Sequence, residues 1–231
     1  MAELGKQPGS KRNAEATRQA ILNAAEAVFA EHGFDGARVE TIAKASGYNQ
    51  GLIFRYFGDK LGLYAEVLRQ IDRQGMEFQR QLIQPLLDDE TDMTDPRRFK
   101  LYLIKGVEAM FDYMAAHPQV IRMLLWEHAE GWQTYSKLAS LFKIEDLEQI
   151  TVLFSKAGMA QSGSDPFVIL ILAEQICWTF LSSFPFYQMI LPDWDFSSSA
   201  PRDRLRNQVA RFIVAGVLSS LEMDRTDLEN R

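Results

Sequence analysis

Residues Arg38–Lys60 read RVETIAKASGYNQGLIFRYFGDK, and this stretch predicts two short helices joined by a tight turn. The first helix has an apolar face made by residues at helical spacing, Val39, Ile42 and Ala43. Gly47 stands where that helix must end, in a position that favours a left-handed backbone. Asn49 can cap a second helix over residues 50–56 through its side-chain oxygen.

The order of helix, glycine turn and second helix is that of the helix-turn-helix motif. We expect Ile53 and Phe57 on the buried side of the second helix, whereas Gln50, Leu52 and Arg55 can point outward. In proteins with this motif, the second helix enters the major groove of DNA with its N-terminal residues at the base edges. The pattern therefore indicates a recognition helix with polar residues at its start.

The segment TIAKASGYNQGLIFRYFGDK, residues 41–60, resembles the DNA-binding signature of the TetR family of bacterial transcriptional regulators. The preceding helix, over residues 17–34, is similar to the first helix of that family. The resemblance covers roughly residues 15–68, and beyond them only the helical pattern and the length agree. It implies an all-α protein with an N-terminal helix-turn-helix domain of three helices and a larger helical domain for ligand binding and dimerisation.

The resemblance also implies a set of DNA-contacting positions in and around the recognition helix. They are Arg38, Thr41, Lys44, Asn49, Gln50, Gly51, Leu52, Phe54, Arg55, Tyr56 and Lys60. Gln50 can bond adenine through two hydrogen bonds, and Leu52 can contact a thymine methyl group. Lys44, Arg55 and Lys60 are candidates for phosphate contacts. The alternative interpretation of these residues is an ordinary capped helix on the protein surface.

Three positions depart from the usual family pattern. Arg38 stands where a Thr or Ser cap is usual, Phe54 where a tyrosine is common, and Tyr56 where a histidine is common. The Tyr56 hydroxyl can take over the phosphate contact that Phe54 lacks. Arg38 and Phe54 support a second interpretation, a helical ligand-binding or scaffold protein of the same fold that has lost specific operator binding.

Composition permits these interpretations without choosing between them. The 231 residues are 47% hydrophobic and 24% charged, which is ordinary for a soluble globular protein. The net charge is −6, but residues 1–60 hold eight Lys/Arg and seven Asp/Glu, a net charge of +1. The single cysteine cannot form an internal disulfide, and Met1–Ser10 lacks the apolar core of a signal peptide. We therefore expect a cytoplasmic protein, and the TetR resemblance implies a bacterial one that associates with the nucleoid when bound to DNA.

The chain is expected to divide into three parts: a flexible basic arm over residues 1–13, the helix-turn-helix domain over 14–60, and an effector-binding and dimerisation domain over 61–231. The arm is either a solvated tail or an additional DNA contact. The first helix is expected to span residues 14–31 and to stop at Gly33. Further helices are expected over residues 59–84, 97–116, 119–130, 134–157, 166–184 and 201–222, with an exposed connection over 85–96. Asp59 can cap the first of these helices, and Gly62 stands where the Glu of a capping box is missing.

Residues 167–191 contain a single charge, Glu174, so a membrane span and a buried helix are both possible interpretations. The polar pairs in the middle of the segment and Pro185 favour a helix buried at a subunit interface. The TetR resemblance implies a homodimer formed through the last two long helices, with no membrane partner.

No catalytic constellation is evident in the sequence. The three histidines lack metal-ligand spacing, and there is no nucleophile elbow, phosphate-binding glycine loop or Cys–His motif. We therefore expect neither enzyme activity, nor a cofactor, nor a bound metal.

The family resemblance implies instead a repressor that leaves a palindromic DNA operator when it binds a small effector. Met and Trp side chains suit an apolar or aromatic effector, although core packing explains most of them equally well. The pocket candidates are Met110, Met114, Trp126, Met159 and Trp178.

Overall fold

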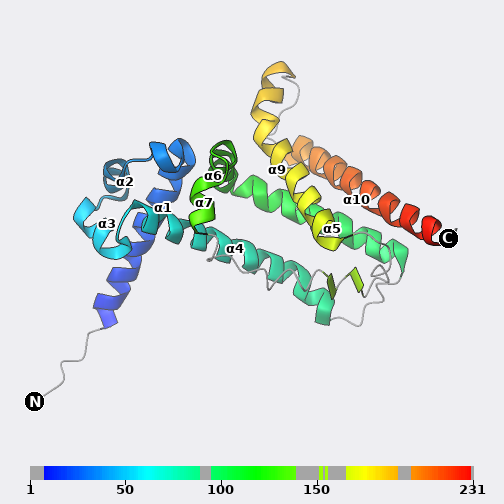
Figure 1. The fold of residues 1–231 in the computed structure, drawn as a ribbon, viewed down its shortest axis with the longest axis horizontal. Coiled ribbons are helices and arrows are strands. Elements are labelled where there is room, and N and C mark those ends of the chain that lie inside the picture. Colours follow the sequence, from blue (N-terminus) through cyan, green and yellow to red (C-terminus); the bar gives the residue numbers. More distant parts are fainter. Residues whose placement is uncertain are drawn as a thin grey trace, which may run out of the picture. The chain divides into compact units, whose positions relative to one another are not determined.

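The computed structural model describes residues 8–88, 95–138, 151–152, 154–155, 165–191 and 199–229, and every regular element within these ranges is a helix (Figure 1). The all-α class is thereby confirmed. The chain forms two compact units, the first from Met1–Gly75 with Gln119–Phe142 and the second from Met76–Pro118 with Lys143–Arg231. A segment that the sequence assigned to the second domain thus clusters with the helix-turn-helix motif.

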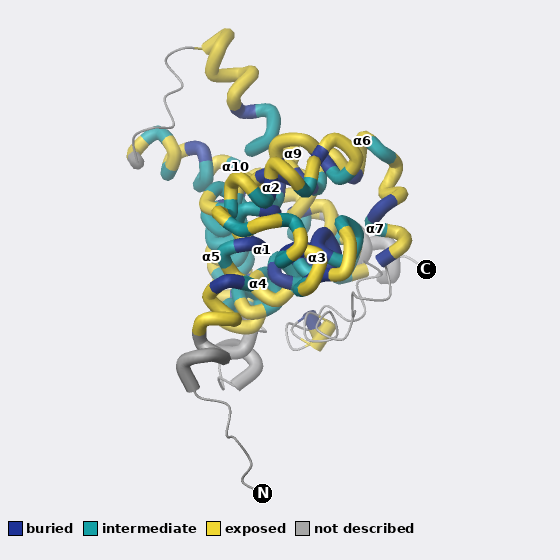
Figure 2. The backbone as a smooth tube through the Cα atoms, turned by 90° about the vertical axis from the view of Figure 1, so that its left-hand side faces the viewer, coloured by how far each residue is buried: buried dark blue, intermediate teal, exposed yellow. Residues whose placement is uncertain are grey.

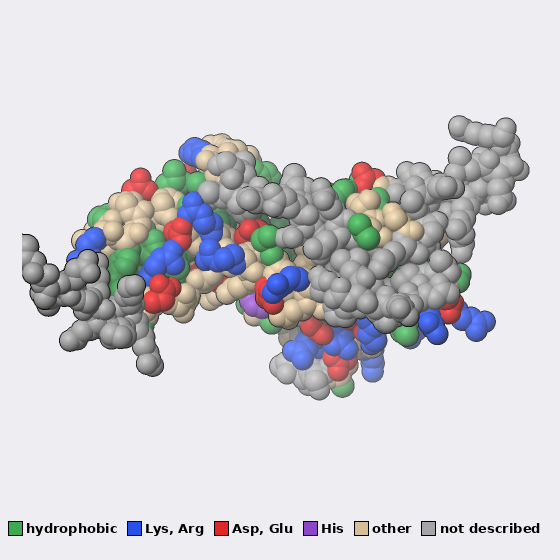
Figure 3. All heavy atoms as spheres, turned by 90° about the horizontal axis from the view of Figure 1, so that it is seen from below, with side chains coloured by type: hydrophobic (Ala, Val, Ile, Leu, Met, Phe, Trp, Pro, Cys, Tyr) green, Lys and Arg blue, Asp and Glu red, His purple; other side chains and the backbone are tan. Residues whose placement is uncertain are grey.

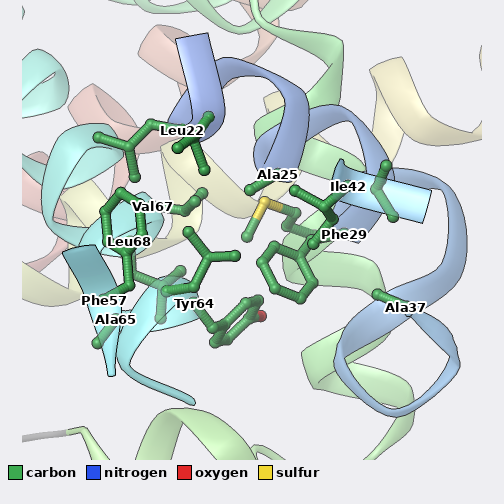
Figure 4. Close-up of a cluster of buried hydrophobic side chains, with 14 of the residues drawn as sticks. Leu22, Ala25, Phe29, Ala37, Ile42, Phe57, Tyr64, Ala65, Val67 and Leu68 are labelled. Carbon is green, nitrogen blue, oxygen red and sulfur yellow. The ribbon is translucent and has the colours of Figure 1, made fainter. Parts of the chain in front are cut away.

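The first unit holds six helical segments around one apolar core. They are α1 (Pro8–Gly36), α2 (Val39–Ser46), α3 (Gln50–Phe57), the first half of α4 (Lys60–Asp88), α6 (Pro118–Ala129) and α7 (Gln133–Lys137). Figure 4 shows buried side chains of this core, among them Phe29 and Tyr64. The rings of these two residues lie edge to face with centroids 4.8 Å apart. Each such fully buried apolar side chain stabilises the fold by roughly 1.5–3 kcal/mol.

Helix α1 differs from the sequence-based expectation at its start. Its first residue is Pro8, so residues 8–13 of the expected arm are helical, while residues 1–7 lie outside the described part of the chain. Proline suits the first turn of a helix because the N–H that it lacks has no partner there. Near the other end, the helical backbone is interrupted at Gly33, with φ 68° and ψ 179°, where the sequence predicted the stop.

The second unit contains the rest of α4 together with α5 (Pro96–Ala116), α9 (Pro166–Ile190) and α10 (Ser199–Glu229). Helices α5, α9 and α10 pack against one another through a second apolar core. Its buried members are Val107, Phe111, Ala173, Cys177, Ala210, Ile213 and Val214. The buried stretches of the chain are dark blue in Figure 2. At the edge of this core, the guanidinium of Arg206 donates to Asp112 Oδ2 over 2.7 Å and joins α10 to α5.

Two prolines do not end their helices where the sequence predicted. Helix α4 continues through Pro85 to Asp88, and α9 continues through Pro185 to Ile190. A proline lacks one backbone hydrogen-bond donor, yet these helices extend three residues beyond Pro85 and five beyond Pro185. The connection expected over residues 85–96 is therefore helical at its start, and its residues 89–94 lie outside the described ranges.

Two other helix boundaries also differ from expectation. Helix α7 ends at Lys137, so the single helix predicted over residues 134–157 is wrong at its N-terminal end. Helix α10 begins at Ser199 and runs to Glu229, which is longer than predicted at both ends.

Candidate nucleic-acid interface

Helix α2 begins without a side-chain cap and ends at a glycine. Arg38 has an extended backbone at the N-cap, and its side chain makes no capping hydrogen bond. At the other end, Gly47 adopts φ 76° and ψ 12°, and its N–H donates to the Ala43 carbonyl. The left-handed conformation favours glycine because it lacks Cβ, and it turns the chain directly into α3.

Helix α3 is capped as the sequence predicted. The Asn49 side-chain oxygen accepts a hydrogen bond from the Leu52 N–H over 2.8 Å. Ile53 is fully buried and Phe57 is 8% exposed, so these two side chains fix one face of the helix to the core. The exposed residues of α3 are Gly51, Phe54 and Arg55, with Phe54 at 42% exposure, so the side of the helix away from the core is open to solvent.

The structure brings all eleven predicted DNA-contacting residues into the first unit, on α2, α3 and their flanks. Seven of them are exposed: Arg38, Thr41, Lys44, Asn49, Gly51, Phe54 and Arg55. The other four are partly buried: Gln50, Leu52, Tyr56 and Lys60. The Nζ of Lys60 donates to the Asp35 carbonyl over 3.2 Å and lies 4.7 Å from the centroid of the Phe34 ring, so this lysine already has partners at the end of α1.

The turn between α3 and α4 is tight, and it depends on Gly62. The N–H of Gly62 donates to Asp59 Oδ1 over 2.7 Å, which confirms Asp59 as the cap of α4. A Cβ atom at position 62 would lie 2.1 Å from the Phe57 carbonyl oxygen. The sequence showed Gly62 only as the position where a capping-box Glu is missing, because the close approach arises from the turn itself.

Polar contacts hold α1 against α4 behind the recognition helix. Glu66 accepts hydrogen bonds from both Arg18 and Arg69, and the Arg18 guanidinium also lies 5.5 Å from the centroid of the Phe57 ring. Nearby, the Gln19 side-chain amide donates to Gln70 Oε1 over 2.8 Å. These contacts fix the two helices that support α3.

A buried carboxylate connects α4, α6 and α7. Glu127 is 1% exposed, and its Oε1 accepts a hydrogen bond from the Tyr64 hydroxyl over 2.7 Å. Its Oε2 accepts from the Tyr135 N–H over 3.0 Å. Burial, reinforced by the bond to Glu127, raises the pKa of Tyr64 far above its usual range. Sequence analysis missed this cluster, and the only signal for it was an acidic residue on the apolar side of a helix.

The effector candidates do not form one group. Met110 and Met114 on α5 lie partly buried beside the core of the second unit. Trp178 on α9, in the same unit, is partly buried. Trp126 belongs instead to the first unit, where its ring lies against Gly33. Met159 lies outside the described residues.

Two further properties of the described residues bear on function. Within these ranges, no group of three or more His, Cys, Asp or Glu side chains is arranged to hold a metal ion. Helix α9 is long and apolar enough to cross a membrane by length and composition alone, a test that core helices of soluble proteins also pass.

On the face shown in Figure 3, Lys and Arg side chains are interspersed with Asp and Glu.

A glycine turn, a capped second helix with an exposed face, and a third helix buried behind them define a helix-turn-helix protein. The sequence model described as "Bacterial regulatory proteins, tetR family" matches residues 21–67, and that described as "Tetracyclin repressor-like, C-terminal domain" matches residues 102–213. The chain belongs to the TetR family.

Similar curated proteins are transcriptional repressors and regulators. The chain is 35% identical over 120 residues to the repressor SCO4008 of Streptomyces coelicolor, covering 52% of this chain and 53% of that protein. It is 31% identical over 117 residues to the repressor NicS of Pseudomonas putida, covering 51% and 50%. The regulator RutR of Escherichia coli is 32% identical over 120 residues, covering 52% and 51%. The chain thus spans about half the length of the curated relatives it matches.

Solved structures show the same fold at lower identity. The regulator FadR from Bacillus subtilis, in complex with stearoyl-CoA, aligns with a TM-score of 0.61 at 17% identity, covering 86% of this chain and 98% of that one. FadR from Bacillus halodurans aligns with a TM-score of 0.59 at 18% identity, also covering 86% and 98%.

Proposed function

We propose that this protein is a cytoplasmic transcriptional repressor that binds double-stranded DNA through α2 and α3. The observation that supports this most strongly is the conformation of the recognition helix α3. Asn49 caps the helix, and Ile53 and Phe57 bury one of its faces in the core, so the opposite face is open to solvent. In this proposal Gln50 and Leu52 contact base edges at the start of α3. Membership of the TetR family and the names of the curated relatives support the same function.

The residues around α3 supply the phosphate contacts in this proposal. Lys44 near the end of α2 and Arg55 on α3 are exposed, and no hydrogen bond or ion pair within the described ranges engages them. Lys60 can reach a phosphate only by exchanging its contacts with the end of α1. Phosphate contacts position a protein on the duplex, whereas base contacts select the sequence.

The proposed repressor is a homodimer formed through α9 and α10. Large apolar side chains are exposed on both helices: Val168, Ile171, Leu172, Ile176 and Phe212. Phe212 is 73% exposed, and an apolar surface of this kind is typical of subunit interfaces. A two-fold dimer would present two copies of α3 to successive major grooves, about 34–36 Å apart, on a palindromic operator.

A small apolar or aromatic effector would release the repressor from DNA. Met110, Met114 and Trp178 remain the proposed contacts within the second unit, and Met159 remains a candidate outside the described residues. An effector shifts a conformational equilibrium only by its difference in affinity for the two states. Helix α4 is the proposed lever because its residues contribute to both units. Catalysis is no part of this proposal.

One observation favours a second candidate, a ligand-binding protein of this fold that has lost specific operator binding. Arg38 makes no capping bond at α2, where the family usually places a Thr or Ser cap. An anisotropy titration of the purified protein with DNA from upstream of its own gene separates the two candidates. We expect tight binding that exceeds binding to a random duplex and weakens steeply with salt, because phosphate neutralisation releases counterions. Equal binding to the two duplexes, repeated across a genome-wide DNA selection, would favour the second candidate.

A further inference from the structure

A pocket of about 360 Å³ lies between α1 and α6, within the first unit. Its lining residues are Ala30, Glu31, Arg122, Leu125 and Trp126. None of them lies on α2 or α3, and the proposed effector contacts Met110, Met114 and Trp178 belong to the other unit. Pockets for small molecules usually measure about 300–1,000 Å³, so this one can hold a small ligand.

The apolar part of the pocket combines a small side chain with two large ones. Ala30 is 3% exposed, while Leu125 and Trp126 are 38% and 39% exposed. The Trp126 ring packs against Gly33, where an added Cβ atom would lie 3.0 Å from Cδ2 of Trp126. A leucine and a tryptophan held open to water in one pocket would gain by covering with an apolar group.

The charged part of the pocket presents one cation and one anion from different helices. Among the described residues, Arg122 has no hydrogen-bond or ion-pair partner. Glu31 lies 3.8 Å from the Nε2 of His32, its neighbour on α1, and is not paired with Arg122. A ligand with only a carboxylate would bind Arg122 but would be repelled by Glu31. A ligand with only an ammonium group would bind Glu31 but would be repelled by Arg122.

We propose that this pocket binds a small amphipathic zwitterion, namely an α-amino acid with an apolar or aromatic side chain. The guanidinium of Arg122 binds the carboxylate, for which its planar fork is suited. The carboxylate of Glu31 binds the ammonium group, and Leu125 and Trp126 contact the side chain. The site is independent of the proposed effector pocket, and it places ligand binding in the unit that carries the helix-turn-helix motif.

The test is fluorine NMR of the full-length protein labelled with 5-fluorotryptophan, with the Trp126 signal assigned through Trp126→Phe. L-Phenylalanine is the probe, and three comparators remove its charges: 3-phenylpropionate lacks the ammonium, phenethylamine lacks the carboxylate, and N-acetyl-phenylalaninamide lacks both. We expect a saturable shift of the Trp126 signal with L-phenylalanine and at least about tenfold weaker binding of each comparator, since each lacks a charge-assisted contact. The Trp132 and Trp178 signals, from residues outside the pocket lining, are expected to stay unchanged.

Two charge-removing variants complete the experiment. Arg122→Gln should abolish the advantage of L-phenylalanine over phenethylamine, and Glu31→Gln should abolish its advantage over 3-phenylpropionate. The matched control Arg204→Gln, at an exposed arginine of α10, should change neither ratio. Circular dichroism of each variant establishes that it is folded. A Trp126 signal unchanged up to the solubility limit of L-phenylalanine, or equal binding of N-acetyl-phenylalaninamide, would overturn the proposal.

Discussion

Replacing Gly62 with alanine should disturb the recognition helix, although sequence rules alone favour the change. Gly62 lies in the first turn of α4, and a Cβ atom there would lie 2.1 Å from the Phe57 carbonyl oxygen and 3.3 Å from the Phe57 carbonyl carbon. Both atoms belong to the backbone at the last residue of α3, so no side-chain rotation relieves the overlap. The turn between α3 and α4 must open instead.

Two opposing terms set the size of the effect. Alanine in place of glycine stabilises a helix interior by about 1 kcal/mol. Overpacking of a well-packed site costs about 1–3 kcal/mol, and a displaced backbone places Gly62→Ala at or beyond the upper end of that range. We therefore expect Gly62→Ala to lower the free energy of unfolding by about 2 kcal/mol. It should also weaken DNA binding, since the displaced residue, Phe57, anchors α3.

The matched control is Gly75→Ala in the same helix. A Cβ atom at position 75 would meet nothing within 4 Å, so the identical substitution should stabilise the protein by about 0.5–1 kcal/mol. Urea denaturation followed by circular dichroism compares the two variants, and anisotropy compares their DNA binding. If Gly62→Ala were as stable as Gly75→Ala and bound DNA as well, the close approach at Phe57 would be refuted.

Other substitutions test the remaining contacts of the first unit. Gly33→Ala should destabilise the protein by about 1–3 kcal/mol, because φ 68° with ψ 179° is a backbone conformation that favours glycine. The control Gly36→Ala should not destabilise it, since a Cβ atom there would make only an ordinary contact at 3.5 Å. Thermal unfolding compares the two variants. Asn49→Ala should cost about 1 kcal/mol in urea denaturation, and Asn49→Asp should restore the cap. Glu127→Ala should cost about 2–4 kcal/mol by leaving the buried Tyr64 hydroxyl and the partly buried Tyr135 N–H without their acceptor. A variant as stable as the wild type in urea denaturation would contradict this role. The pKa of Tyr64 is raised in the folded protein, so above pH 10.0, the ordinary pKa of tyrosine, the unfolded chain binds fewer protons than the folded one. The free energy of unfolding should therefore fall as the pH rises above 10.0. Tyr64→Phe should reduce this pH dependence.

Local chemistry made part of the structure predictable from sequence. The left-handed Gly47 and the caps at Asn49 and Asp59 depend on residues only a few positions apart, and the structure confirms all three. The buried faces of α2 and α3 followed from apolar spacing, since Ile42 and Ile53 are both fully buried.

Features that depend on distant parts of the chain were not predictable. Glu127 is satisfied by Tyr64, which lies 63 positions away, and Trp126 packs on Gly33 of another helix. A composition rich in Met and Trp could not show that Trp126 belongs to the unit of the helix-turn-helix motif. Pro185 was also misleading, because sequence shows a lost hydrogen bond but not whether the rest of the helix compensates.

Base-specific DNA binding by α3 is tested most directly by replacing Gln50. The measurement is the affinity of wild type, Gln50→Ala and the control Gln133→Ala, an exposed glutamine of α7, for the operator and for operators with single base changes. We expect Gln50→Ala alone to lose about 1–3 kcal/mol of binding free energy and its preference at one base pair. Unchanged affinity and unchanged preference in Gln50→Ala would remove Gln50 from the contact surface and contradict the proposed orientation of α3 on DNA.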